Sequence, residues 1–199
     1  SWMVLRTSYL GGFRLGLMDQ TDASRGGQKA PACLQARLSG GVALERAVSA
    51  AELDILNVAH VNAIRHIPGT GVVIMGARTL GASRADMYVN VRRSLNYIRQ
   101  SLTESTRFAL FENNDAKLWA QINSVASRFL GAYWSTGGLR GGTPDEAFYV
   151  KCDGELNTPT SIAEGKVVYE VGVALQYPAE FIVIRIGQWE GGQSVAELA

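Results

Sequence analysis

The sequence predicts an α/β fold: a mixed β-sheet flanked by helices, with an extended C-terminal arm. Two amphipathic helical patterns in the middle of the chain alternate with short runs of β-branched residues, and strand-like runs cluster toward the C-terminus. Such alternation is typical of layered α/β domains. At 199 residues, the chain is long enough for one large domain, or one domain with an appendage, around a buried core.

Four helical segments are predicted before the last third of the chain. The clearest covers 89–102, where apolar residues recur on one stripe: Val91, Leu95, Ile98 and Leu102. A second long helix is predicted from Asn114, as its N-cap, to about Trp134. Ser49 and Glu52 have the spacing of a capping box and predict a helix to about residue 56. A short helix over 9–18 is predicted to precede an exposed loop over 21–29.

Strands are predicted from short β-branched or aromatic runs bounded by turn residues. They cover 41–45, 61–67, 71–75, 108–111, 147–152, 167–175 and 180–186. Pro68-Gly69 predicts a turn between the second and third of these, 137–143 a glycine-rich loop, and 161–164 a helical turn. In the last strand the isoleucines at alternate positions are expected on one side of the pleat.

Composition and charge give no sign of a nucleic-acid or membrane partner. The chain has 19 lysines and arginines against 18 acidic residues, so it lacks the basic excess that draws proteins to phosphate backbones or anionic lipid. No apolar run approaches the about 18 residues that a membrane-spanning helix needs. Cys33 and Cys152 are too few for a disulfide framework and are interpreted as reduced thiols of an intracellular protein.

Residues that commonly carry catalysis or bind metals are sparse and poorly spaced. His60 and His66 lie at i and i+6, which matches no zinc motif. The glycines at 69 and 71 precede a predicted strand rather than a helix, so they indicate a turn and not a phosphate loop. Cys152 ends a strand-like run and is interpreted as a structural thiol. The sequence therefore predicts no catalytic, cofactor or metal site, and an α/β enzyme with an unrecognised site is the alternative.

A series of phrases resembles the conserved C-terminal region of contractile phage tail sheath proteins. In chain order they are Gly76-Ala77-Arg78-Thr79, Tyr88-Val89-Asn90-Val91-Arg92-Arg93, Phe111-Glu112-Asn113-Asn114-Asp115 with Leu118-Trp119, the run 143–153, and the run 178–186. A looser similarity covers 25–32. Each phrase is short, but their order over about 20–187 makes the resemblance specific. Gln28, Ala63 and Thr70 depart from residues common in the family.

The resemblance implies a mechanical role and no enzymatic activity or cofactor. Sheath proteins stack in six-fold rings around an inner tube and contract once, which drives the tube through a target envelope. The implied partners are other copies of the chain, the inner tail tube protein, and baseplate and tail terminator proteins, with no nucleic acid and no membrane. The implied location is the virion tail, assembled in the bacterial host cytoplasm. The sheath of a phage-like bacteriocin or an extracellular injection particle is the alternative.

The resemblance also divides the chain into three parts. Residues 1–32 are expected to be a lead-in segment and loop left from an upstream region, 33–187 the sheath C-terminal α/β domain, and 188–199 a C-terminal arm. Because sheath proteins carry outer domains before this region, we expect the chain to be the C-terminal part of a longer protein. A strand donated by a neighbouring copy would satisfy the backbone groups at an open sheet edge.

Two contact surfaces are predicted on this basis. The subunit interface comprises the final strand and the arm: Phe181, Ile182, Val183, Ile184, Arg185, Ile186, Trp189, Val195 and Leu198. Three glycines, at 187, 191 and 192, are expected to form the hinge of the arm. The second surface is the basic helix face of Arg92, Arg93 and Arg99, hypothesised to contact an acidic inner tube, with a solvated helix face as the alternative.

Overall fold

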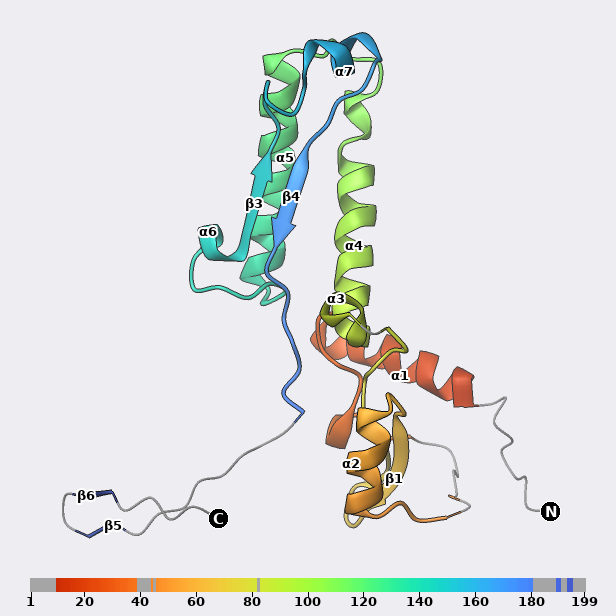
Figure 1. The fold of residues 1–199 in the computed structure, drawn as a ribbon. Helices are drawn as coiled ribbons and strands as arrows, with labels where there is room; N and C mark the ends of the chain where they lie inside the picture. The colour runs from red at the N-terminus through yellow and green to blue at the C-terminus, as the bar shows by residue number, and fades with distance from the viewer. Residues whose placement is uncertain are drawn as a thin grey trace.

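The computed structural model describes residues 10–38, 44, 46–81, 83–180, 189–190 and 193–194 (Figure 1). Two long helices, α4 (Val89–Ser105) and α5 (Ala116–Ser135), stand side by side as a helical hairpin. The shorter helices among these residues are α1 (Leu10–Arg25), α2 (Ala50–Val58), α3 (Arg84–Met87), α6 (Pro144–Ala147) and α7 (Pro159–Ala163), with 3-10 turns η1 (Cys33–Gln35) and η2 (Arg107–Ala109). This confirms the predicted existence of both long helices.

The described strands form three antiparallel pairs. They are β1 (Ala63–Ile67) with β2 (Gly71–Met75), β3 (Phe148–Lys151) with β4 (Glu170–Val173), and β5 (Trp189–Glu190) with β6 (Gln193–Ser194). The α/β class is confirmed. The pairing differs from one continuous mixed sheet, because no parallel ladder occurs among the described strands.

The largest core lies between the helical hairpin and the β3–β4 pair. Its buried side chains come from both helices and from the segments flanking the strands: Val91, Ile98, Leu102, Ala126, Leu130, Leu139, Ala147 and Leu175. The 89–102 stripe therefore faces the core as predicted, with Val91, Ile98 and Leu102 buried and Leu95 partly buried against them. The β3–β4 pair lies along α5, as Figure 1 shows, with Phe148 opposite Val173 and Lys151 opposite Glu170.

A smaller core lies at the other end of the molecule, between α1 and β2. It comprises Leu17, Ala36, Leu38 and Ile74. The short segment 36–38 adds to the free side of β2, because the Leu38 amide donates to the Val72 carbonyl at 2.8 Å and the Ile74 amide donates to the Ala36 carbonyl at 3.2 Å. The β1–β2 turn at Pro68-Gly69 is confirmed, with Gly69 at a φ of 78°.

The caps of two helices show how well local sequence positions a helix start. The predicted capping box of α2 is confirmed, since the Ser49 hydroxyl accepts from the Glu52 amide and the Ser49 amide donates to the Glu52 carboxylate. The cap of α5 is Asp115 and not Asn114: the Leu118 amide donates to Asp115 Oδ1 at 3.0 Å. Asn114 instead accepts from the indole Nε1 of Trp119 and donates to the Lys166 carbonyl.

Two further predictions about elements are wrong. The loop expected over 21–29 begins only after Arg25, because α1 continues past Thr21, whose buried hydroxyl donates back to the Leu17 carbonyl. The strand expected over 108–111 is the η2 turn and the turn that follows it, since this segment reverses the chain between antiparallel helices and pairs with no strand among the described residues. Of the predicted strands at 41–45 and 180–186, residues 41–43, 45 and 181–186 lie outside the described residues.

Candidate assembly interface

The segment 176–180, after β4, carries the chain from the helical hairpin toward α2 and β2; we call it the exit segment. Gln176 is held through both its side chain and its backbone. Its side-chain Nε2 donates to the Leu139 carbonyl at 3.0 Å, and its backbone carbonyl accepts from Asn90 Nδ2 at 3.0 Å. Asn90 Nδ2 also donates to the Gln28 carbonyl at 3.1 Å. One buried amide at the start of α4 therefore ties the loop that contains Gln28 to the segment 176–180.

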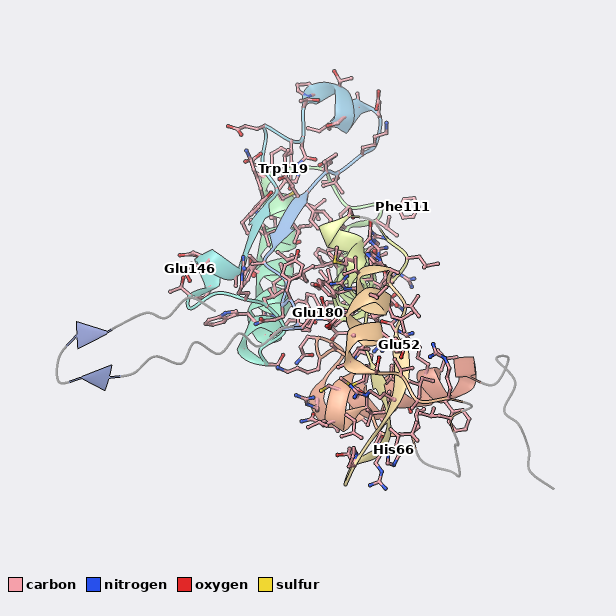
Figure 2. The ribbon with its side chains drawn as sticks, turned by 60° about the horizontal axis from the view of Figure 1, so that its bottom comes forward. Glu52, His66, Phe111, Trp119, Glu146 and Glu180 are labelled. Carbon is pink, nitrogen blue, oxygen red and sulfur yellow. The ribbon has the colours of Figure 1, made fainter. Side chains whose placement is uncertain are left out.

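Glu180, labelled in Figure 2, accepts hydrogen bonds from the side chains of Arg78 and Tyr88. We call these three residues, Arg78, Tyr88 and Glu180, the exit clamp. Arg78 Nε donates to Glu180 Oε1 at 3.0 Å, and Arg78 Nη2 donates to Oε2 at 2.6 Å. The Tyr88 hydroxyl donates to Oε2 at 2.9 Å. The side chains of Arg78 and Glu180 are 12% and 14% exposed. A two-pronged ion pair with this little solvent contact fixes orientation as well as distance.

The cationic side of the exit clamp is itself anchored. Arg78 Nη1 donates to the Asn57 carbonyl at the end of α2, at 2.9 Å. The Arg78 amide donates to Asn62 Oδ1 at 2.8 Å, and Asn62 Nδ2 donates to the Arg78 carbonyl at 2.7 Å. The Tyr88 ring meets the Tyr177 ring edge to face, with centroids 6.1 Å apart. The clamp is therefore part of a continuous network that joins α2, β1, α4 and the exit segment.

Ionisation within the exit clamp follows from burial and from these hydrogen bonds. Burial acts to raise the pKa of Glu180, but the hydrogen bonds from Arg78 and Tyr88 and the charge of Arg78 outweigh it, so the pKa is lowered. Burial, and then the hydrogen bond to Glu180, raise the pKa of Tyr88. The bond to Glu180 raises the pKa of Arg78. The clamp is therefore a carboxylate held by a guanidinium and a neutral phenol.

The β3–β4 pair leaves two strand edges open. Among the described residues, the outer edges of β3 and β4 take part in no backbone hydrogen bond. The nearest further pairing lies past the ladder, where the Ala174 amide donates to the Ala147 carbonyl and the Arg140 amide donates to the Ala174 carbonyl. An isolated two-stranded ladder is marginal in water, and open edges are templates for another strand.

Two hollows border these elements. An apolar cavity of about 250 Å³ lies at the exit clamp, lined among others by Cys33, Leu53, Met75, Ala77, Pro178 and Glu180. A wider groove, about 770 Å³, opens at the tip of the helical hairpin near the start of β4, with Leu110, Leu118, Val167 and Tyr169 in its walls. Phe111, at the same tip, is fully exposed and points away from the molecule (Figure 2).

The predicted tube-contact arginines do not form one free basic surface. Arg92 Nη1 pairs with Asp86 at 2.8 Å, and Arg93 forms a two-pronged pair with Asp22 of α1. Arg99 is exposed. Two of the three charges are thus balanced within the chain, a pairing that sequence periodicity does not reveal.

Of the predicted subunit-interface residues, the structure describes only the backbone of Trp189. It lies in β5, opposite Ser194 of β6. Phe181, Ile182, Val183, Ile184, Arg185, Ile186, Val195 and Leu198 lie outside the described residues.

The histidines and cysteines considered above as catalytic or metal-binding candidates lie in ordinary structural environments. His60 Nδ1 lies 2.7 Å from the Thr79 carbonyl, and His66 is exposed on β1. Cys152 is buried, which raises the pKa of its thiol, and Cys33 is exposed; neither forms a disulfide. Within the described ranges, no three side chains of metal-binding type gather. No helix of the described part has the length and apolarity to cross a bilayer.

Sequence reasoning did not find the exit clamp. Arg78 and Glu180 are separated by 102 positions, and no periodicity links residues so far apart. Each stands inside a phrase that carried the resemblance, at 76–79 and 178–186. Their presence in these phrases was the signal that the sequence offered, but it does not show that Arg78 and Glu180 pair with each other.

Comparison with known proteins agrees with this architecture. The phage tail sheath C-terminal domain family matches residues 85–188. No curated protein matches the chain. The solved structures that are similar over most of it include the anti-feeding prophage baseplate (30% identity, 88% of this chain and 49% of that chain, TM-score 0.81). They also include the sheath of the PVC extracellular contractile injection system in its contracted state (33%, 87% and 49%, 0.81) and the contracted helical sheath of the anti-feeding prophage (30%, 87% and 48%, 0.80).

The chain spans about half the length of these structures. The family match covers more than half of the chain and includes the helical hairpin, both strands of the β3–β4 pair and Glu180 of the exit clamp. On this evidence the chain belongs to the phage tail sheath C-terminal domain family.

Proposed function

We propose that this chain is the assembly-forming part of a contractile sheath that surrounds an inner tube and drives it through a target envelope. The observation that carries the proposal is the β3–β4 pair, whose outer edges have no partner among the described residues. In a family whose matched relatives include helical sheaths in a contracted state, open edges of this kind favour completion by strands from neighbouring copies.

The donated strand in this proposal is the C-terminal segment, with the subunit-interface residues from Phe181 to Leu198. Its apolar residues alternate between the two faces of a strand, so one face could cover the helical hairpin while backbone groups pair with an open edge. In Figure 1 the β3–β4 pair lies along α5, so an added strand next to β4 would extend cover toward α4. The domain boundaries at 32 and 187 belong to the same proposal.

The partners follow from this role. Other copies in six-fold stacked rings are the primary partner, and the six-fold symmetrised anti-feeding prophage baseplate supports both that symmetry and a baseplate contact. The inner tail tube and a tail terminator complete the set, with no nucleic acid and no membrane. Within the tube proposal, Arg99 is the stronger candidate contact, because Arg92 and Arg93 already have carboxylate partners. In this proposal the protein has a structural role rather than an enzymatic one. It is located in the tail, which assembles in the host cytoplasm.

A phage tail and an injection particle remain two sources for such a sheath. The matched structures come from an anti-feeding prophage and an extracellular contractile injection system, which favours the injection particle. The genes beside this one distinguish them: capsid and terminase genes indicate a phage, and their absence from a complete cluster indicates a particle.

Deletion of residues 188–199 tests the strand-donation proposal. We expect the shortened protein to stay folded by circular dichroism and to form no cylinders by negative-stain microscopy, whereas the full-length protein forms hollow striated cylinders. Cysteines at Glu170 and Arg185, in a Cys33→Ser background, give the matching positive test, because a disulfide between copies requires the segment of one copy at β4 of another. Normal cylinders from the shortened protein would refute the role of the arm 188–199, and absence of the disulfide between copies would refute pairing of the final strand, from Phe181, with β4.

A further inference from the structure

The chain is held up to Glu180 by side chains rather than by a backbone ladder. The last backbone pairing before the exit is at Ala174 and Leu175, where Arg140 and Leu139 are the partners. Between 176 and 180, no backbone-to-backbone hydrogen bond occurs among the described residues. The position of this segment therefore depends on the contacts of Gln176 with Asn90 and Leu139, the Tyr88–Tyr177 ring contact and the exit clamp.

The exit clamp holds Glu180, the last residue of this continuous segment, through two side chains. Arg78 follows β2 and is fixed to α2 and Asn62, Tyr88 immediately precedes α4, and both donate to the same carboxylate. A guanidinium fork sets the plane and the direction of the carboxylate, which an ammonium point charge does not do. The backbone at residue 180 is therefore fixed in direction as well as in place.

We propose that Arg78, Tyr88 and Glu180 are positioning residues that fix the point and direction at which the C-terminal segment leaves the domain toward a neighbouring copy. This inference rests on the proposed strand donation. A fixed exit narrows the volume that the segment explores, which raises its effective concentration at an acceptor edge within reach. It also transmits the orientation of one copy to the next, because the segment starts from a rigid base.

Spin-label distance measurement tests the clamp in the single chain. Labels at Ala179→Cys and Ser124→Cys, both exposed positions, in a Cys33→Ser background, report the place of the exit segment relative to α5. We expect one narrow distance distribution in the parent, loss of that single narrow distribution in Arg78→Ala, and an intermediate width in Arg78→Lys, which keeps the charge and loses the fork.

Arg93→Ala is the matched control. It removes another two-pronged arginine–carboxylate pair, with Asp22, that forms no hydrogen bond with residues 176–180 in the described part of the chain, and we expect its distribution to remain as narrow as that of the parent. A distribution in Arg78→Ala as narrow as the parent's would overturn the inference. So would equal broadening in Arg93→Ala, since the effect would then be general loosening of the domain.

Electron microscopy of the full-length protein tests the consequence for assembly. We expect Arg78→Ala cylinders to lose their uniform subunit spacing and Arg93→Ala cylinders to keep it; uniform spacing in both overturns the role in positioning neighbours. Failure of the parent protein to form any cylinder would count against the proposed function itself. The spin-label distances do not depend on assembly, so the two failures are distinguishable.

Discussion

The two ends of the molecule are stabilised in different ways. The helical-hairpin end, comprising α4, α5, β3 and β4, packs around the largest apolar core, with a second cluster of Leu118, Ile122 and Cys152 along α5. The small-sheet end, comprising α1, α2, β1 and β2, has a core of four buried side chains and is joined to the hairpin by polar contacts at Asn90, Arg93 and Arg78. The comparison teaches that one end of a domain can be held mainly by apolar burial while the placement of the other depends on a few directed polar bonds.

The largest expected effect is in the hairpin core. Leu130 is fully buried, so Leu130→Ala should lower the free energy of unfolding by about 3–4 kcal/mol through lost burial and a residual cavity. Leu17→Ala in the small core should cost less, about 2–3 kcal/mol, because its surroundings can collapse more easily. Urea unfolding followed by circular dichroism measures both, with Ser124→Ala as the exposed control. Equal losses at the two positions would contradict the comparison.

Breaking the exit clamp should have the next largest effect on the free energy of unfolding. Arg78→Ala leaves a mostly buried carboxylate without its cation, and we expect a loss of about 2–3 kcal/mol in the free energy of unfolding. Arg93→Ala, whose pair with Asp22 is about one-third exposed, should cost about 1 kcal/mol or less. The same urea experiment decides it, and the prediction fails if Arg93→Ala is the more damaging change.

Stability should depend on pH through Glu180. Its pKa is lower in the folded chain than in the unfolded chain, so the unfolded state binds more protons as the pH falls. The contribution is complete above the ordinary carboxyl pKa of about 4.3 and is lost as the pH falls through the lower folded value. Comparing unfolding free energies from pH 6 downward, at roughly half-unit steps, for parent and Glu180→Gln measures it. An unchanged pH slope in the variant would exclude Glu180 as a source.

The N-cap of α5 at Asp115 should make a smaller contribution to the stability of the hairpin end. Asp115→Ala removes the acceptor for the Leu118 amide and should cost about 1 kcal/mol. Asn113→Ala, two residues earlier and exposed, is the control and should be nearly neutral. Thermal unfolding resolves the difference, and equal effects would show that Asp115 does not act as the cap.

The smallest expected effect is a gain at the hairpin tip. Phe111 has a φ of 66° and a fully exposed ring, so Phe111→Gly relieves backbone strain without losing burial. Because glycine also loses more entropy on folding, we expect a net gain of about 0.5 kcal/mol. Phe111→Ala keeps a Cβ at this φ and should show no gain. A gain for alanine equal to that for glycine would assign the effect to the ring and not to the backbone.

The sequence by itself determined the elements whose causes are local. The apolar stripe ending at Leu102, the capping box at Ser49 and the turn at Gly69 each depend on residues within a few positions of one another. These patterns, and the ordered phrases that resemble the sheath family, placed both long helices and the α/β class correctly.

Only the tertiary structure decided which distant groups meet. The Arg78–Glu180 pair and the Arg93–Asp22 pair depend on how separate elements pack. The run Phe108–Phe111 looked like a strand, yet it reverses the chain between α4 and α5 and exposes Phe111. Backbone propensity acts between near neighbours in the chain, whereas ion pairs and burial depend on distance in space, which the linear order of residues does not contain.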